Sequence, residues 1–290
     1  MMDGVLSDVL PYLLCPLCGT DLELGAGSVR CASGHSFDVA RQGYVNLLPG
    51  GAQAGTADTP AMVADRAAFL SAGHFGSLAG LLAEHVTTVT GGGGMVLDAG
   101  AGTGYYLAAV LDQSPESVGA AFDVSKFAAR RAARAHSRIG SVVCDLWRDL
   151  PIRSEAACAV LNVFAPRNPA EYRRVLRSDG GLFLVAPAPG HLRELIRPLG
   201  LLSVSDEKIQ QVDDLLGRHF ELISRQDHEI ALLLPATAVQ TLACMGPSAW
   251  HLTAAHVRER LAGMADPLPV TASFTLSVYR PGRRQRSSGV

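Results

Sequence analysis

The stretch that most constrains the fold runs from Asp98 to Gly104 and reads Asp-Ala-Gly-Ala-Gly-Thr-Gly. It follows the apolar run Met95 to Leu97 and leads through two tyrosines into a helical pattern at 107–111. This order predicts a strand, a glycine turn and a helix whose first amides face a ligand above the sheet edge. Alternating glycines weaken strands and helices, so a turn that serves packing alone is the weaker interpretation. The stretch predicts a site for a nucleotide-like cofactor.

The spacing of the glycines narrows the cofactor. Gly100, Gly102 and Gly104 alternate with other residues, and Asp98 stands two positions before the first of them, unlike the Gly-x-Gly-x-x-Gly of dinucleotide sites. This pattern resembles motif I of the class I S-adenosylmethionine-dependent methyltransferases. The resemblance implies an α/β, Rossmann-like fold with a mostly parallel sheet. It also implies that Asp98, the three glycines and Thr103 bind S-adenosylmethionine.

A second motif lies near the N-terminus. Cys15, Cys18, Cys31 and His35 form the pattern Cys-x2-Cys-x12-Cys-x3-His. The spacing predicts a closed tetrahedral zinc site with a structural role, because all four positions are filled by protein and so short a segment does not fold without such a staple. The alternative is a set of unrelated buried cysteines with a surface histidine. Three of the six cysteines are crowded here, which does not suggest a secreted disulfide framework.

Apolar runs and helical patterns alternate after the glycine turn, as expected for a parallel sheet. Asp123 ends the second strand, where its carboxylate can accept the ribose hydroxyls of an adenosyl group. Asp145 ends the third strand and would meet the adenine edge, although a turn or cap role is equally open. The predicted strands are 95–97, 118–122, 142–144, 156–163, 180–186, 228–234 and 270–279, the last two antiparallel, and the predicted helices include 60–71, 78–89 and 125–136.

The run Phe37 to Leu48, together with the cysteine motif, resembles the N-terminal region of the 23S ribosomal RNA (guanine-N1)-methyltransferases. Gly73-His74-Phe75 and the segment from Pro187 to Leu192 also match motifs of this family. The resemblance implies that Phe75 and His191 contact the cofactor. Without it, Phe75 would be interpreted as an ordinary core aromatic and His191 as a histidine at a helix start.

The segment from Asn162 to Arg167 ends the fourth strand, where this architecture holds the methyl acceptor. It loosely resembles the Asn-Pro-Pro-Tyr motif of enzymes that methylate base nitrogens, but the second proline and the aromatic are displaced. We therefore expect Phe164 to stack on a base and Asn162 to form a hydrogen bond near the transferred methyl. Residues 245–250 also resemble the family and would border the substrate pocket.

The resemblance implies transfer of a methyl group to N1 of a guanine in a hairpin loop of 23S ribosomal RNA. The base must be unpaired or flipped out, since N1 is used in pairing. Positioning is the larger contribution to catalysis. Asp145, His191 and water all stay open as the acceptor of the N1 proton. The alternatives are a small-molecule methyltransferase with a structural zinc site and a non-catalytic RNA-binding protein.

The zinc module, with Arg30, Arg41 and Tyr44, is the favoured RNA-contact region, because small zinc folds grip RNA and aromatics stack on unpaired bases. Pairing of two modules in a homodimer would widen the cleft for a hairpin. Two further arginine groups are either phosphate-contacting faces or ordinary solvated helix faces. They comprise Arg130, Arg131, Arg134, His136 and Arg138, and separately Arg173, Arg174 and Arg177.

The whole chain of 290 residues is divided into a zinc-binding module at 1–49, a linker at 50–59, a methyltransferase domain at 60–280 and a disordered tail at 281–290. The linker is expected to let the module move. A net charge of −2 excludes general attraction to polyanions, so any nucleic-acid surface must be local. The absence of a membrane-length apolar run or a leader pattern predicts no membrane partner and a cytoplasmic location. The arginine-rich composition resembles that of the actinobacterial branch of this methyltransferase family, whose members confer resistance to macrolides such as tylosin and mycinamicin.

Overall fold

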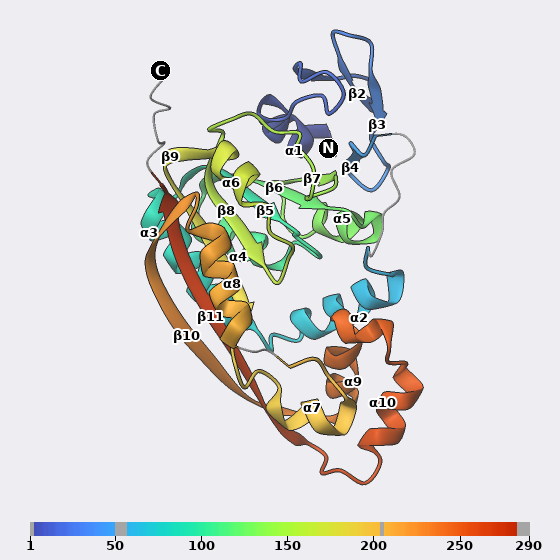
Figure 1. Ribbon diagram of the computed structural model, residues 1–290. Helices are drawn as coiled ribbons and strands as arrows, with labels where there is room; N and C mark the ends of the chain where they lie inside the picture. Colours follow the sequence, from blue (N-terminus) through green and yellow to red (C-terminus); the bar gives the residue numbers. More distant parts are fainter. Residues whose placement is uncertain (1–2, 50–56, 204–205, 283–290) are drawn as a thin grey trace.

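The computed structural model describes residues 3–49, 57–203 and 206–282, and a single eight-stranded sheet runs through it (Figure 1). The strand order is β10-β11-β9-β8-β5-β6-β7-β4. Strand β11 is antiparallel to both of its neighbours, and every other neighbouring pair is parallel. The bounds are β4 Tyr44–Asn46, β5 Gly93–Ala99, β6 Glu116–Asp123, β7 Ile139–Val143, β8 Ala157–Val163, β9 Leu176–Pro187, β10 Phe220–Leu234 and β11 Leu268–Pro281.

This sheet confirms the predicted class I methyltransferase fold, including its antiparallel closing pair. Strands β7 and β8 are buried along their whole length, as expected for parallel strands covered on both faces. The first helix of the domain begins as predicted, because Pro60 occupies its first turn and the Thr59 hydroxyl accepts a hydrogen bond from the Met62 amide at 3.2 Å. The first strand, predicted at 95–97, is longer in the structure, since β5 also includes Gly93 and Gly94 at its start.

Helices cover both faces of the sheet and enclose two apolar cores. One face is covered by α2 Pro60–Ser71, α3 Gly76–Thr90, α4 Tyr105–Gln113, α5 Lys126–Ala132, α7 Arg193–Leu199, α9 Ala236–Cys244 and α10 Ala254–Leu261. The other face carries α1 Asp3–Val9, α6 Pro169–Val175 and α8 Asp206–Leu216, together with the 3₁₀ turn η1 Leu10–Tyr12. A second 3₁₀ turn, η2 Pro247–Trp250, follows α9. Within the described ranges, none of the helices combines the length and apolarity needed to cross a membrane.

The N-terminal module has its own antiparallel sheet of β1 Leu22–Leu24, β2 Ser28–Cys31 and β3 Ser36–Asp38. It then contributes β4 to the main sheet, where Val45 pairs with Val142 of β7 (Figure 1). Helix α1 packs on the same strand, and Val9 meets Gly140 so closely that an added Cβ there would lie 2.7 Å from it.

These contacts correct the expectation that the linker lets the module move. Residues 50–56 of the predicted linker lie outside the described residues, but β4 precedes them and is hydrogen-bonded to β7. The Arg153 guanidinium adds an ion pair to Asp21 of the module at 2.6 Å. The module is therefore fixed to the catalytic domain by a shared sheet. Residues 283–290 of the predicted tail also lie outside the described residues, and β11 extends to Pro281.

Candidate active site and metal centre

The glycine turn joins β5 to α4 and is tied to the end of β6. The amides of Gly100 and Ala101 donate to the Phe122 carbonyl at 2.8 and 3.0 Å. Gly100 has a φ of +91°, and a Cβ added there would lie 2.3 Å from the Cβ of Ala165 in the loop after β8. Only glycine allows both this backbone conformation and this close approach. The turn and the loop after β8 thus form two touching walls of one site.

A cleft of about 990 Å³ opens along the carboxyl ends of the parallel strands. This volume is near the upper end of the range of roughly 300 to 1,000 Å³ that is usual for small-molecule sites. The cleft therefore has space for a methyl acceptor beside the cofactor. Most of the predicted cofactor and substrate residues line it. They are Phe75, Asp98, Gly100, Gly102, Thr103, Asp123, Asp145, Phe164 and His191. The residues Met245 to Ser248 and Trp250 line it too, as expected. Gly104 and Asn162 do not belong to its lining.

Two buried polar groups face the cleft from beneath the glycine turn. Oδ1 of Asp98 and the Tyr106 hydroxyl are buried and have no hydrogen-bond partner within the described residues. Burial, and secondarily the charge of Asp123, raise the pKa of Asp98 to about 8. Unpaired buried polar atoms are costly, so this pair is suited to a charged, hydrogen-bonding ligand. S-adenosylmethionine, with its amino acid group, fits this donor and acceptor set.

Asp123 and Asp145 stand at the strand ends where the sequence predicted them. The Asp123 carboxylate accepts from the amides of Gly102 and Ser125, both at 2.8 Å, and each oxygen keeps a lone pair for a ribose hydroxyl. Asp145 lines the cleft but also acts in a turn, accepting from the Trp147 amide at 3.0 Å. The turn role of Asp145 is therefore confirmed, and its contact with the adenine edge stays a prediction. Trp147, whose role the sequence did not indicate, is 70% exposed at the cleft.

His191 is a donor rather than a base in this arrangement. The Ser273 amide donates to its Nδ1 at 3.2 Å, so in the neutral ring the proton sits on Nε2. Burial lowers the pKa of His191 to about 4, which keeps the ring neutral near pH 7. The ring packs on Phe274 at 4.9 Å, and Phe75 packs edge-on against the same aromatic at 5.0 Å.

The loop after β8 presents an aromatic side chain to the cleft. Phe164 is 43% exposed and has a φ of +55°, a conformation that phenylalanine rarely adopts and that is typical of functional loops. Asn162 holds this loop from behind: its Nδ2 donates to the carbonyl of Pro166 at 2.8 Å and to the Tyr172 hydroxyl at 3.1 Å. Asn162 is fully buried and does not line the cleft, so the expectation that it reaches the transferred methyl is corrected: its amide holds the loop that carries Phe164.

Three arginines line the cleft without having been predicted, and one of them, Arg225, is paired with Asp213. Arg66 bridges α2 and α9 by an ion pair with Asp58 and a 2.7 Å hydrogen bond to the Met245 carbonyl, and it lies beside Gly102. Arg167 lines the cleft with its Nε buried, and it makes no hydrogen bond or ion pair within the described part of the chain. Nothing in the local pattern separates these arginines from surface ones, since their role depends on residues far away in sequence.

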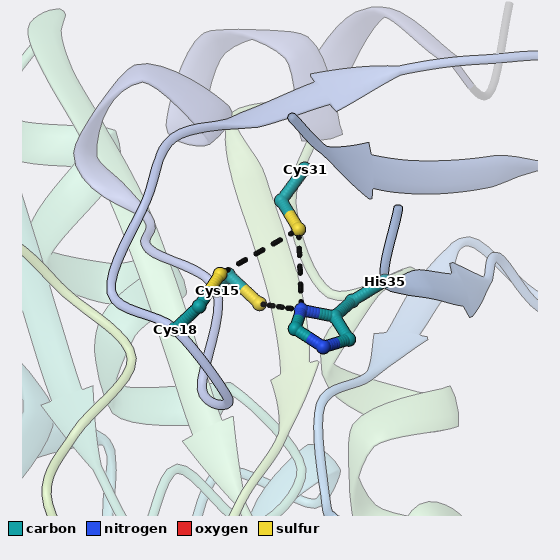
Figure 2. Close-up of side chains that lie close together, drawn as sticks. All are labelled: Cys15, Cys18, Cys31 and His35. Carbon is teal, nitrogen blue, oxygen red and sulfur yellow. Dashed lines mark hydrogen bonds between the residues drawn. The ribbon is translucent and has the colours of Figure 1, made fainter. Parts of the chain in front are cut away.

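The four predicted zinc ligands converge in the module (Figure 2). Their ligand atoms all lie within 4.8 Å of one another. Nδ1 of His35 lies 3.5 Å from the Cys15 sulfur and 3.4 Å from the Cys31 sulfur, and the sulfurs of Cys18 and Cys31 are 3.7 Å apart. Zinc bonds of 2.0 to 2.3 Å place tetrahedral ligands about 3.3 to 3.8 Å apart. The cluster therefore fits a structural zinc ion, with His35 binding through Nδ1.

Comparison with known proteins identifies relatives of both parts. Residues 13–53 match the family model described as "RlmA, N-terminal", a zinc ribbon. A "Putative 23S rRNA (guanine-N(1)-)-methyltransferase" of Micromonospora griseorubida is 48% identical over 94% of this chain and 99% of its own length. The "23S rRNA (guanine(748)-N(1))-methyltransferase" of Streptomyces fradiae is 45% identical over 94% of this chain and 98% of its own. The "Putative 23S rRNA (guanine-N(1)-)-methyltransferase YxjB" of Bacillus subtilis (strain 168) is 31% identical over 62% of this chain and 66% of its own length.

Proposed function

The chain belongs to the family of 23S ribosomal RNA (guanine-N1)-methyltransferases, and we propose that it transfers a methyl group from S-adenosylmethionine to N1 of a guanine in a hairpin loop of that RNA. The observation that carries this proposal is the sequence identity of 48% and 45% to two such relatives over 94% of this chain. The glycine turn at the cleft and the four converging zinc ligands agree with it. The guanine at position 748, named for the Streptomyces fradiae relative, is the first candidate target.

The residues of the cleft divide into a cofactor end and an acceptor end. We place the methionine part of the cofactor against Asp98, Tyr106 and Arg66, and its ribose against Asp123. When bound, S-adenosylmethionine supplies an activated methyl group. At the acceptor end, Phe164 offers a face for stacking on the flipped guanine, and Arg167 offers donors to guanine O6 or N7. His191 donates through Nε2, so Asp145 or water stays open as the acceptor of the N1 proton.

The proposal is tested by methyl incorporation from labelled S-adenosylmethionine into 23S RNA of a strain that lacks the enzyme. The modified base is mapped by a block to reverse transcription. We expect one stop, at a loop guanine equivalent to position 748. Incorporation into a metabolite fraction and none into RNA would favour the small-molecule enzyme. Hairpin binding without any turnover would favour the non-catalytic RNA-binding protein.

The acceptor end makes a separate prediction. Phe164→Ala should lower kcat/KM for the hairpin by about 10- to 100-fold, because stacking of one base on an aromatic is worth about 1 to 3 kcal/mol. Phe164→Tyr keeps the ring and should retain most of the activity. Arg167→Gln should lower the rate of hairpin methylation, because Arg167 stabilises negative charge on O6 of the guanine. Part of the lost rate should return at alkaline pH. Steady-state kinetics with the hairpin measures both, and unchanged kinetics in Phe164→Ala would contradict the stacking role.

The raised pKa of Asp98 predicts that cofactor binding is coupled to the release of a proton. Its pKa of about 8 lies far above the unfolded value near 4, so the free folded protein holds this proton near pH 7 and loses stability as the pH rises from about 4 to 8. A cationic amino group beside it favours the carboxylate, so binding at pH 7 should release up to about one proton and less at pH 9. Titration calorimetry in buffers of different ionisation heat measures this release. Asp98→Asn should abolish it.

We further propose that methylation protects the ribosome from a macrolide, as in the branch that the sequence resembles. A susceptible host should gain tolerance to tylosin on expressing this chain but not on expressing an inactive variant. Equal tolerance in both would contradict the resistance role. A cytoplasmic location, where the ribosomal RNA is, and a homodimer paired through the zinc modules complete the proposal. Sedimentation of the zinc-loaded protein tests the homodimer.

A further inference from the structure

Helix α5 carries a group of exposed basic side chains. Lys126, Arg130, Arg131 and Arg134, the last in the turn after the helix, are all exposed, and none forms an ion pair or a side-chain hydrogen bond within residues 3–49, 57–203 and 206–282. Phe127, 37% exposed, lies among them, with the Lys126 ammonium 5.4 Å from its ring centre. These five residues are called the α5 basic face.

The other basic residues of the two arginine groups singled out in the sequence are engaged by partners within the protein. Arg138 donates to the carbonyls of Leu111, Ser114, Pro115 and Ser117. Arg174 is bound to Glu171 and to the carbonyls of Leu150 and Ile152, and Arg177 is paired with Asp179. Arg173 points to the Gly282 carbonyl at 3.5 Å, and His136 pairs with Asp112. Each of these side chains is thus already engaged, whereas those of the α5 basic face are left for a ligand.

The position of α5 connects the two parts of the molecule. The helix starts just after Asp123 of the cleft, and the Ser125 hydroxyl donates to the Asp58 carbonyl at the cleft wall. Its body lies between α2 and β4, the strand that the zinc module contributes (Figure 1). Its inner face consists of Ala128, Ala129 and Ala132, which pack closely on the sheet. The basic face therefore lies between the module and the cleft on a firmly seated helix.

The chemistry of this face fits RNA. Lys126, Arg130 and Arg134 follow one another at four-residue spacing, a row with steps of about 6 Å along the helix direction. Cations in a row neutralise backbone phosphates, and an exposed aromatic stacks on unpaired bases. The chain as a whole is slightly acidic, so this surplus of positive charge is local. We propose that the α5 basic face binds the phosphate backbone of the substrate hairpin between the zinc module and the cleft, which rests on the proposed function.

The test measures the salt dependence of binding of the full-length, zinc-loaded protein to a fluorescent 23S hairpin fragment. Each lost phosphate contact lowers the slope of log affinity against log salt by about 0.7 to 0.9. Arg130→Gln combined with Arg134→Gln should therefore lower the slope by about 1.5 and weaken binding on the order of 30-fold at 0.1 M salt. Arg130→Lys with Arg134→Lys should restore both.

The matched control removes two arginines that are already paired elsewhere, Arg177→Gln with Arg280→Gln, and changes the net charge by the same amount. It should leave the slope unchanged. Equal slopes in the control and in the α5 variant would overturn the inference, as would wild-type binding to anionic vesicles in preference to the hairpin. Wild-type protein that neither methylates nor binds the hairpin would refute the proposed function itself. Cofactor affinity by calorimetry should be the same in all variants.

Discussion

Replacing Gly100 with alanine should nearly abolish cofactor binding, with a loss of affinity of about 100-fold or more. The new Cβ would lie 2.3 Å from Ala165 Cβ, and the backbone φ of +91° disfavours any side chain. Relief requires the loop after β8 to move, but Asn162 anchors that loop and Phe164 is already held at an unusual φ. Strain and overpacking together should also lower the free energy of unfolding by about 2 to 5 kcal/mol.

Titration calorimetry with S-adenosylmethionine and thermal unfolding measure both effects of Gly100→Ala. Gly80→Ala is the matched control: it lies within α3, and no atom lies within 4 Å of the added Cβ. It should bind the cofactor normally and gain about 0.5 to 1 kcal/mol of stability, as alanine does in a helix. Near wild-type cofactor affinity in Gly100→Ala would contradict the role assigned to the turn.

Removal of a zinc ligand should have a comparably large effect, but on the RNA reaction and the module rather than on cofactor binding. Cys31→Ser, or a strong chelator, removes a metal whose binding energy, about 10 to 16 kcal/mol in small zinc domains, exceeds what so short a segment gains from its own core. We expect the module to unfold and β4 to separate from β7. Methylation of the hairpin should fall at least about 100-fold, while the cleft and cofactor affinity change little.

Zinc content, hydrogen exchange at Tyr44–Asn46 and methylation rate measure this outcome together. Cys244→Ser serves as the control, because this buried cysteine lies in the core of the catalytic domain, away from the cluster. It should retain one zinc ion per chain and protection of β4. A Cys31→Ser protein that contains no zinc and still methylates RNA at the normal rate would show that the module is dispensable.

Most strands of the main sheet were predictable from the sequence because they are continuous apolar runs separated by turns. Strand β10 was predicted only over 228–234, since its first half is largely polar and exposed. The glycine turn and zinc ligands were predictable for a similar reason, since each is a short pattern with a fixed chemical requirement. Strand β4 was not predicted, because three residues of the module carry no strand signal until they meet β7, about a hundred positions away.

Side-chain roles were harder to predict than element positions. Asn162 stands in the expected segment, yet its Nδ2 is used by the Pro166 carbonyl and the Tyr172 hydroxyl. Arg130 and Arg138 look equivalent in the sequence, but only Arg138 reaches carbonyls brought near by folding. Which polar groups are used internally and which are left for ligands depends on the tertiary structure, so a single sequence does not reveal it.

The pairing of β4 with β7 also bears on how the protein avoids aggregation. A parallel sheet has two edges with unpaired backbone groups, and each invites strands from other molecules. At one edge, β10 bears charged residues, including Glu221, Arg225, Asp227 and Glu229. At the other, the outer hydrogen-bonding edge of the buried strand β7 is paired with β4, and β4 belongs to a module that we expect a metal ion to hold together. Zinc binding should therefore protect the protein from aggregation as well as hold the module in its fold. We expect a chain that loses zinc to expose the apolar edge of β7, which can then pair with strands of other molecules.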